Sequence, residues 1–224
     1  MRGELDAYVS RGAHKLKKAL DCFGIDVRDR VCLDVGASTG GFTDVMLRAG
    51  ARRVYAVDVG YNLLDYRLRS DDRVVCMERT NARFIEPAQF DPRPSFGATD
   101  VSFISLKAVL PAALAVLEGE DAAFVALVKP QFEAEKDEVG EKGVVRDRAV
   151  HEKVLESVCG FIPTLGWRVA GLDFSPIRGP EGNIEFLVHI VRERNMTQIE
   201  QEWSINVTID RAYDNFSKLT NGVL

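Results

Sequence analysis

The 224-residue sequence lacks several features, and each absence excludes a class of protein. No apolar run approaches the roughly 20 residues that a membrane-spanning helix needs. The N-terminal residues Met1–Tyr8 contain no signal-peptide core, which predicts a cytoplasmic protein that does not associate with membranes. Only four cysteines occur, and none stands in a C-x-x-C pair or a zinc-like spacing. We therefore predict buried free thiols and no metal site.

An excess of positive charge is also missing. The chain contains 34 acidic and 29 basic residues, which gives a net charge of −5 and argues against a protein that coats nucleic acid without specificity. A short basic block, R-G-A-H-K-L-K-K, spans Arg11–Lys18. Such a block is either the solvated face of a helix or a local phosphate-binding patch. The candidate phosphate contacts within it are Arg11, His14, Lys17 and Lys18.

What the sequence does contain is a glycine-rich turn between a buried strand and a helix. V-C-L-D-V over Val31–Val35 predicts the strand, Gly36–Gly41 form the turn, and the helix runs from Phe42 to Leu47. Glycine has no Cβ and tolerates positive φ, so a ligand can approach this backbone closely. The free N–H groups at the start of the helix are additional donors. The stretch therefore predicts binding of a small polar ligand.

Strands and helices alternate along the chain, which predicts an α/β domain with a mainly parallel sheet. The last two strands have no helix between them, which implies one antiparallel strand. The predicted strands are Val31–Val35, Arg53–Asp58, Val74–Met77, Phe96–Asp100, Ala122–Val128, Trp167–Phe174 and Ile184–Val191. The predicted helices are Arg11–Phe23 with Ser10 as N-cap, Phe42–Leu47, Tyr61–Leu68, Leu106–Leu117 and Ala149–Leu165.

The remaining segments are a long polar loop and a C-terminal stretch. Gln131–Arg148 is aperiodic and contains glycine, as is typical of loops that close over a site. We predict that residues 1–192 form one domain that includes the basic helix. Residues 193–224, with an amphipathic segment at 209–219, are predicted to be a C-terminal helical extension.

Polar residues end four of the predicted strands: Asp34 with Gly36, Asp58, Asp100 and Lys129. In parallel sheets ligands bind outside the carboxyl ends of the strands, so these side chains are expected to border one site. Two cofactor classes compete for it. A dinucleotide site requires G-x-G-x-x-G and an acid about 20 residues further on. Asp58 meets the second condition, but the turn reads G-x-x-x-G-G and lacks the middle glycine.

This turn favours a cationic ligand without phosphate, such as S-adenosylmethionine. In that interpretation the turn backbone lies near the methionine carboxylate and Asp34 lies near the ammonium group. Asp58 accepts hydrogen bonds from the ribose hydroxyls. An NAD-dependent oxidoreductase is the alternative from another class.

Asp34–Asp44, which reads D-V-G-A-S-T-G-G-F-T-D, resembles the cofactor motif of class I methyltransferases. Five further strings occur in the order of the TlyA/hemolysin-A family, and the chain resembles these FtsJ-like ribosomal RNA 2′-O-methyltransferases. The strings are Tyr8–Leu16, Glu78–Arg83, Asp100–Leu106, Val128–Glu133 and Gly182–Phe186. The resemblance implies a Rossmann-like class I methyltransferase fold: a seven-stranded, mostly parallel sheet with one antiparallel strand and helices on both faces.

The resemblance also implies an activity and a set of residues. The enzyme would transfer a methyl group from S-adenosylmethionine to a ribose 2′-hydroxyl of ribosomal RNA, free or in ribosomal subunits. The implied catalytic tetrad is Lys15, Asp100, Lys129 and Glu185. The implied cofactor-binding residues are Asp34, Gly36, Ala37, Ser38, Thr39, Gly40, Gly41, Phe42, Asp58, Val59, Thr80, Asn81 and Asp100.

The chemistry of this reaction explains the residue types of the tetrad. A ribose 2′-hydroxyl is a poor nucleophile until its proton is removed or strongly hydrogen-bonded. A lysine beside a second cation, in a partly desolvated site, can act as a base. We therefore expect Lys129 to be the base and Lys15 the neighbouring cation, with Asp100 and Glu185 orienting both ammonium groups. The reaction needs no metal ion.

Other functions agree less well with the sequence. Methyltransferases that act on amino groups or bases usually carry an N/D-P-P-Y string after the fourth strand, where this chain reads D-V-S-F. A non-enzymatic ribosome-binding or hemolysin-like role is not supported, because the sequence contains neither a membrane-inserting stretch nor a strong basic face. Members of the family usually carry an S4-type RNA-binding domain ahead of the catalytic domain. Since Tyr8 stands seven residues after the first residue, this chain is expected to lack that module.

Overall fold

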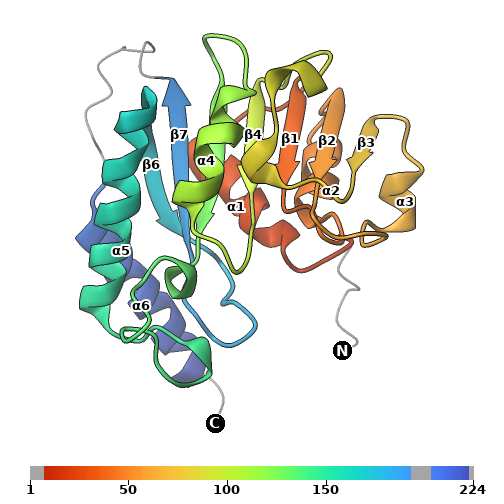
Figure 1. Ribbon diagram of the computed structural model, residues 1–224. Helices are drawn as coiled ribbons and strands as arrows, with labels where there is room; N and C mark the ends of the chain where they lie inside the picture. Colours follow the sequence, from red (N-terminus) through yellow and green to blue (C-terminus); the bar gives the residue numbers. More distant parts are fainter. Residues whose placement is uncertain (1–7, 193–202, 222–224) are drawn as a thin grey trace.

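Seven strands form one sheet at the centre of the molecule, in the order β3-β2-β1-β4-β5-β7-β6 (Figure 1). The structure is a computed structural model, and it describes residues 8–192 and 203–221. The strands are β1 (Val31–Val35), β2 (Arg53–Val57), β3 (Val74–Met77), β4 (Phe96–Thr99), β5 (Ala123–Val128), β6 (Trp167–Phe174) and β7 (Phe186–Arg192). The helices are α1 (Ala13–Phe23), α2 (Gly41–Arg48), α3 (Tyr66–Arg69), α4 (Leu106–Ala115), α5 (Arg148–Phe161) and α6 (Ile205–Asn221).

Only β7 runs against the direction of the rest of the sheet. It pairs antiparallel with β5 and with β6, while the pairs among β1 to β5 are parallel. The predicted seven-stranded, mostly parallel sheet with one antiparallel strand is therefore confirmed. The interior strand β5 reads A-F-V-A-L-V and is buried along its whole length, as is usual for a strand covered on both faces of the sheet.

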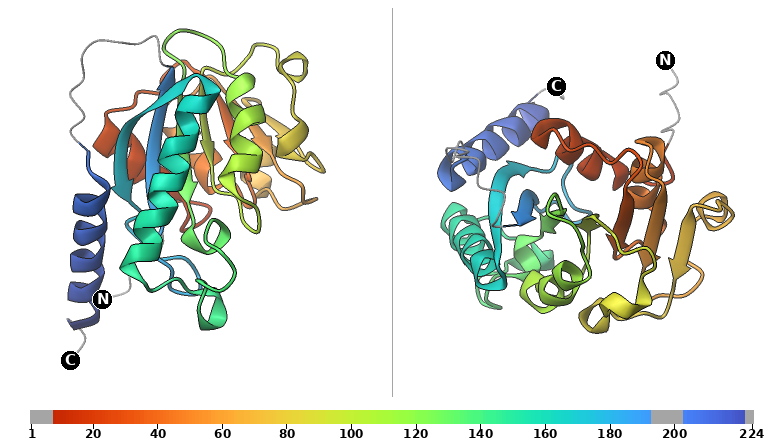
Figure 2. Two further views of the ribbon diagram at one scale, coloured as in Figure 1. Left: turned by 60° about the vertical axis from the view of Figure 1, so that its left-hand side comes forward. Right: turned by 90° about the horizontal axis from the view of Figure 1, so that it is seen from above.

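Helices cover both faces of the sheet, which confirms the prediction. Leu16 of α1 and Met46 of α2 belong to the apolar core on one face, whereas Leu110 of α4 and Leu155 of α5 belong to the core on the other. The view from above shows α1 and α4 on opposite sides of the sheet (Figure 2). Each such fully buried side chain stabilises the fold by about 1.5–3 kcal/mol.

The C-terminal helix contributes to the same core. Helix α6 packs against α5 and β6, and its Ile209, Ala212 and Phe216 are buried. The amphipathic segment predicted at 209–219 lies within this helix. Residues 193–202 and 222–224 of the predicted extension lie outside the described residues.

The prediction that Ser10 caps the first helix is wrong. Helix α1 begins at Ala13, and Gly12 occupies the N-cap position without a side-chain cap. Ser10 instead takes part in a turn, in which its carbonyl oxygen accepts a hydrogen bond from the Ala13 N–H at 3.2 Å. This turn packs against the first residue of α2, because a Cβ added to Gly41 would lie 2.3 Å from the Ser10 Oγ. Tertiary packing therefore determines where α1 begins.

The helix predicted over Tyr61–Leu68 is also wrong in extent. Helix α3 spans only Tyr66–Arg69, and the Asp65 side chain caps it by accepting the Arg67 N–H. The preceding turn contains Asn62 at φ +58°, a conformation that asparagine tolerates better than most residues. Local hydrogen bonds from asparagine and aspartate side chains compete with helix formation in this way.

The parallel strands bring their polar ends to one edge of the sheet. Asp34 lies within β1, whereas Asp58, Asp100 and Lys129 directly follow β2, β4 and β5. The loop over 131–148 runs below this edge and contains only short 3₁₀ turns, as predicted (Figure 1). Across the described ranges, we find no helix that combines the length and the hydropathy required to cross a membrane.

Candidate functional site

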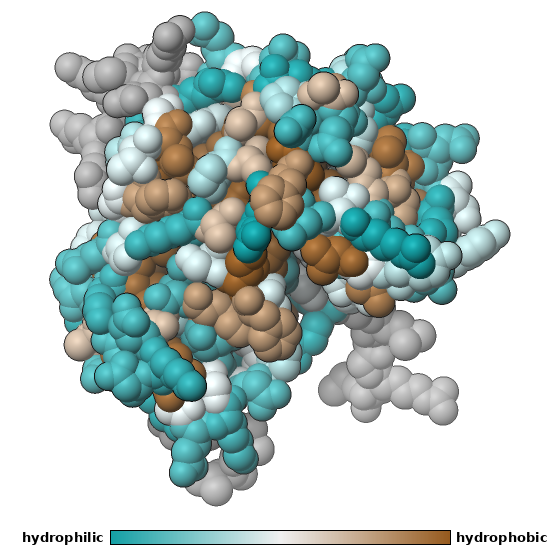
Figure 3. Space-filling model, viewed as in Figure 1, coloured by the Kyte–Doolittle hydropathy of each residue, from teal (hydrophilic) through white to brown (hydrophobic). Residues whose placement is uncertain are grey.

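Two adjoining cavities lie at the carboxyl edge of the sheet. The larger has a volume of about 570 Å³ and lies between the start of α1, the glycine turn and the loops after β5 and β6. The smaller, of about 370 Å³, lies between the turn after β2 and the segment after β4. Both are lined by Gly36, Ser38, Asp100, Ser102 and Phe103. Figure 3 shows apolar side chains gathered in the middle of this face, bordered by hydrophilic ones.

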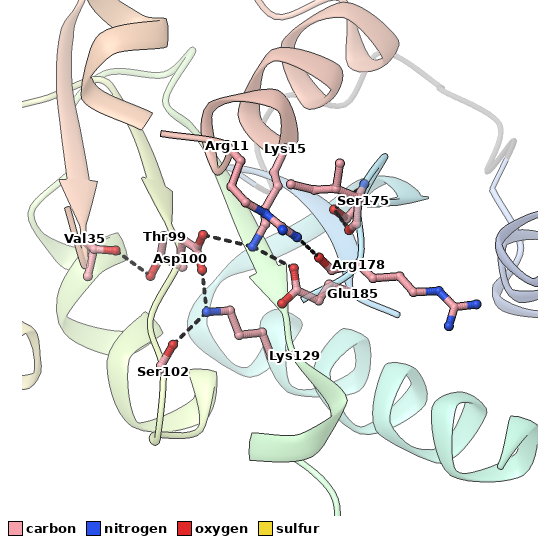
Figure 4. Close-up of polar contacts among 11 residues, drawn as sticks. Arg11, Lys15, Val35, Thr99, Asp100, Ser102, Lys129, Ser175, Arg178 and Glu185 are labelled. Carbon is pink, nitrogen blue, oxygen red and sulfur yellow. Dashed lines mark hydrogen bonds and ion pairs between the residues drawn. The ribbon is translucent and has the colours of Figure 1, made fainter. Parts of the chain in front are cut away.

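Four charged side chains meet in the larger cavity and alternate in sign (Figure 4). The Asp100 carboxylate lies between two lysines, with Oδ1 2.5 Å from the Lys129 Nζ and Oδ2 3.2 Å from the Lys15 Nζ. Lys15 also lies 2.7 Å from Oε2 of Glu185. The Lys129 ammonium donates a second hydrogen bond, of 2.8 Å, to the Ser102 Oγ. The structure thus brings together all four residues of the expected tetrad.

The tetrad is almost completely shielded from water. The exposed fractions of the side chains are 8% for Lys15, 10% for Lys129, 19% for Asp100 and 0% for Glu185. Burial lowers the pKa of Lys15, but the charges of Asp100 and Glu185 outweigh it, so the pKa lies above its usual value. Burial raises the pKa of Glu185 even though Lys15 opposes that shift. Lys15 is consequently a cation at neutral pH.

Each member of the tetrad is held by a secondary-structure element. Asp100 and Lys129 directly follow β4 and β5, and Glu185 directly precedes β7. Lys15 belongs to α1, whose buried neighbour Leu16 packs into the core beneath it. Because these elements pack on one sheet, the positions of the four charges are fixed by the core.

The glycine turn is shaped so that little space remains for a side chain. Gly36 has φ +81°, and a Cβ at this position would lie 3.0 Å from Cγ1 of Val101 and 3.1 Å from the Asp100 carbonyl oxygen. Gly40 has φ +97°, and a Cβ there would lie 2.2 Å from Cδ1 of Leu68. Glycine at these two positions therefore allows the turn to pack closely against neighbouring segments of the protein.

Asp34 lies behind the turn and is completely buried. Its Oδ2 accepts hydrogen bonds from the N–H and the hydroxyl of Thr43, at 2.8 and 2.6 Å, and so caps the N-terminus of α2. Its Oδ1 has no hydrogen-bond partner among the described residues. Burial raises the pKa of Asp34 to about 7, against the effect of the Thr43 hydrogen bonds. The residue borders the larger cavity.

The smaller cavity contains the remaining residues expected to bind the cofactor. Asp58 accepts the N–H groups of Ser38 and Gly60 at 2.8 and 2.7 Å, which ties the glycine turn to the end of β2. Thr80 and Asn81 line the same cavity, together with Val59. Each Asp58 oxygen has a second lone pair that the backbone does not use.

The four basic residues of the Arg11–Lys18 block occupy different environments. Arg11 lines the larger cavity and donates to the Arg178 carbonyl oxygen at its rim. Lys17 is exposed and pairs with Asp21. Lys18 pairs with Asp173 at 3.3 Å, and burial lowers its pKa. His14 borders a separate open groove on the outer side of α1. Only Arg11 of the four thus lies at the cavity that holds the tetrad.

Sequence reasoning missed several residues of the site. Ser102 binds Lys129, and Phe103, with a side chain 91% exposed, stands at the junction of the two cavities. Glu133 connects the loop after β5 to the start of α4. All three residues belong to strings that carry the family resemblance. Their contacts, however, join segments about 30 residues apart in the sequence, and the periodicity of a sequence does not show such contacts.

The site fits a cationic methyl donor better than a dinucleotide. The buried Asp34 Oδ1 is an acceptor without a partner among the described residues, and Gly36 and Ser38 of the turn line both cavities. Within the described residues, no cluster of three or more histidine, cysteine or acidic side chains forms a metal site. A mostly parallel sheet in this strand order, with an antiparallel β7 between β5 and β6, a glycine turn after β1 and an acid after β2, is the arrangement of a class I methyltransferase.

The chain belongs to the FtsJ-like methyltransferase family, whose model matches residues 8–192. It is 50% identical over 182 residues to the 16S/23S rRNA (cytidine-2′-O)-methyltransferase TlyA of Mycobacterium tuberculosis, covering 81% of this chain and 68% of that protein. It is 46% identical over 185 residues to Hemolysin A of Brachyspira hyodysenteriae, covering 82% and 77%. The predicted resemblance to the TlyA/hemolysin-A proteins is confirmed.

Solved structures agree with this assignment. A Streptococcus thermophilus protein that carries a hemolysin name is 50% identical, with a TM-score of 0.91, and the match covers 98% of this chain and 79% of that one. More distant structures, at 13% and 16% identity with TM-scores of 0.60 and 0.58, carry methyltransferase names and share the fold. The class I methyltransferase fold expected from the sequence is therefore confirmed.

Proposed function

We propose that the protein transfers a methyl group from S-adenosylmethionine to a ribose 2′-hydroxyl of ribosomal RNA. The observation that carries the proposal is the row of alternating charges, Lys129, Asp100, Lys15 and Glu185, beside the glycine turn. Relatives named as rRNA (cytidine-2′-O)-methyltransferases support the choice of ribose and of ribosomal RNA. Such a substrate places the reaction in the cytoplasm.

S-Adenosylmethionine supplies an electrophilic methyl group on a sulfonium. In this proposal the turn at Gly36–Gly41 and the free Asp34 Oδ1 hold its methionine end, and Asp58 holds its ribose. Thr80 and Asn81 lie where its adenine would reach the smaller cavity. Aligning the hydroxyl oxygen with the methyl carbon supplies most of the catalysis, because the reaction is an in-line displacement.

The two lysines make different contacts, which support different roles for them in this proposal. Lys15 contacts two carboxylates and its pKa is raised, so it remains a cation. Lys129 contacts one carboxylate and one hydroxyl, those of Asp100 and Ser102. In this proposal Lys129 would accept the proton of the 2′-hydroxyl while the oxygen bonds to the methyl carbon and the carbon–sulfur bond of the sulfonium breaks, with a neutral thioether as the leaving group. Asp100 then stabilises the new ammonium group.

Aromatic side chains at the mouth of the cavity fit an extruded base. The Phe103 and Phe132 ring centroids are 5.1 Å apart, and both residues line the larger cavity. Stacking of a base on an aromatic ring contributes about 1–3 kcal/mol to binding. Arg11 at the rim is the candidate contact for an adjacent phosphate.

The test is incubation of the full chain with labelled S-adenosylmethionine and, separately, free ribosomal RNA and each ribosomal subunit, followed by mapping of 2′-O-methylated nucleotides. Lys129→Met is expected to retain cofactor binding and to lose roughly 10²- to 10⁴-fold in rate, the usual contribution of a general base. Lys153→Met is the control, because Lys153 pairs with Glu138 on the surface.

Three results would contradict the proposal. Full activity of Lys129→Met would show that Lys129 is not the catalytic base. Labelled methyl groups on nucleobases instead of ribose would show that the ribose 2′-hydroxyl is not the methyl acceptor. If calorimetry showed that the protein binds NAD but does not bind S-adenosylmethionine, the result would favour an NAD-dependent oxidoreductase.

A further inference from the structure

The segment that follows β5 contacts the segment that follows β4 at three successive points. Lys129 donates to the Ser102 Oγ at 2.8 Å. The Phe132 ring packs against that of Phe103. Glu133 then closes the series, since it binds the start of α4. Residues 129–133 thus contact the loop over 102–105 at Ser102, Phe103 and Ser105.

Glu133 makes two hydrogen bonds to the start of α4. Its Oε2 accepts the Ser105 hydroxyl at 2.7 Å, and its Oε1 accepts the Leu106 N–H at 2.6 Å. The first turn of α4 contains no acidic residue, so Glu133 supplies from another segment the negative charge that a helix N-terminus favours. Ser105 already caps the helix by accepting the Lys107 N–H. Glu133 therefore adds to this cap, because it binds both the Ser105 hydroxyl and the Leu106 N–H.

The loop requires such a restraint because Phe103 is held in an unfavourable backbone conformation. Its φ is +63°, in the left-handed region that bulky residues rarely adopt. Its side chain is 91% exposed, so burial of its own ring does not stabilise this conformation. Strain of this kind persists only where the surrounding structure fixes it.

We propose that Glu133 is a positioning residue of the methyl-transfer site. Its two hydrogen bonds to Ser105 and Leu106 hold the 102–105 loop so that the Phe103 ring projects over the junction of the cavities, where it receives the substrate base. This inference rests on the proposed RNA substrate. Glu133 itself touches neither the substrate nor the cofactor and acts through Phe103.

A double-mutant cycle on the full chain tests the inference at saturating S-adenosylmethionine. Glu133→Ala and Phe103→Ala are each expected to lower kcat/KM for the RNA about tenfold, the scale of one lost base–aromatic stack. The double variant is expected to lose no more than Phe103→Ala alone, because both changes remove the same contact. Glu133→Gln keeps an acceptor for the Leu106 N–H and is expected to restore most of the activity.

Asp147→Ala is the matched control. Asp147 caps α5 by accepting the Ala149 N–H at 2.8 Å, so its loss also weakens a helix N-terminus. We expect it to lower Tm as Glu133→Ala does, but to leave kcat/KM unchanged. Equal kcat/KM for the Glu133→Ala and Asp147→Ala variants would overturn the positioning role. A loss in the double variant equal to the product of the losses in Glu133→Ala and Phe103→Ala would overturn it as well.

Hydrogen exchange gives a readout that does not depend on activity. The amides of residues 101–107 are expected to exchange faster in Glu133→Ala than in wild type and in Asp147→Ala. Unchanged exchange would overturn the restraint. If wild type methylated no RNA, the proposed function would fail, and the exchange data would still decide whether Glu133 fixes the loop.

Discussion

The buried carboxyl group of Asp34 makes the substitution Asp34→Asn informative. Asparagine keeps an oxygen that can accept both hydrogen bonds from Thr43, now made by the Asp34 Oδ2 at 2.8 and 2.6 Å. The change therefore removes a charge and leaves the cap of α2 in place. It also replaces the unpartnered Oδ1 by an amide group.

The sign of the effect on stability follows from the pKa. Burial raises the pKa of Asp34 from 3.8 to about 7, so the folded protein holds a proton that the unfolded chain has lost. Stability from this group is therefore full below about pH 4 and falls as the pH rises to about 7. A difference of about three pH units corresponds to about 4 kcal/mol. The Asp34→Asn variant does not lose this stability as the pH rises, because asparagine does not ionise.

Thermal unfolding between pH 4 and pH 8 measures the difference. At pH 4 the two proteins are expected to have similar Tm values. At pH 8 the variant is expected to have the higher Tm, by about 10 °C for a chain of this size. Other titrating groups are present in both proteins and cancel in the comparison. Parallel Tm profiles across this range would refute the assignment of the raised pKa to Asp34.

Cofactor binding is expected to change in the opposite direction. If the Asp34 Oδ1 holds the ammonium group, its replacement removes a charge-assisted hydrogen bond, which weakens binding roughly 10- to 100-fold at pH 8. Near pH 6 the wild type is expected to release a proton on binding, visible as a dependence of the calorimetric heat on the buffer. An unchanged Kd and a buffer-independent heat for wild type would place the ammonium group elsewhere.

The remaining predictions concern the turn and the rim of the cavity. Gly36→Ala is expected to weaken S-adenosylmethionine binding at least tenfold, because its Cβ would lie 3.0 Å from Val101 at φ +81°, whereas Gly160→Ala, with nothing within 4 Å, is the control. Normal calorimetric affinity of Gly36→Ala would exclude this placement. Arg11→Gln is expected to raise KM for RNA and to lower the salt slope of RNA binding by about 1. The exposed Arg28, paired with Asp26, is the control, and equal salt slopes for Arg11→Gln and Arg28→Gln would remove the phosphate contact.

The fold could be predicted because its signals are local. Short apolar strands ending in polar residues, with helices between them, give a parallel sheet whose carboxyl ends share one edge. Asp58, Asp100 and Lys129 lie at that edge for this reason alone. The family resemblance then added Lys15 and Glu185, which no spacing rule could connect to the sheet.

Features that depend on packing between distant segments could not be predicted. The basic helix illustrates this, because its periodicity places Lys15 largely off the apolar face. The structure buries Lys15, since α1 begins over the sheet edge where Asp100 and Glu185 pair with its charge. The sequence predicts Ser10 as the cap of this helix, whereas in the structure Gly12 is the N-cap and Ser10 packs against Gly41.

In the proposed function, helix α1 therefore supplies a charge to the site in addition to a candidate contact for RNA. Glu185 is completely buried, and the Lys15 ammonium at 2.7 Å is the charge that compensates it. A buried carboxylate without a partner is strongly destabilising, so removing Lys15 would favour protonation of Glu185. Asp100 would then be left with Lys129 alone, and the alternation of charge would be lost. In the proposed function, the half of the site that activates the hydroxyl therefore depends on this helix being folded against the sheet.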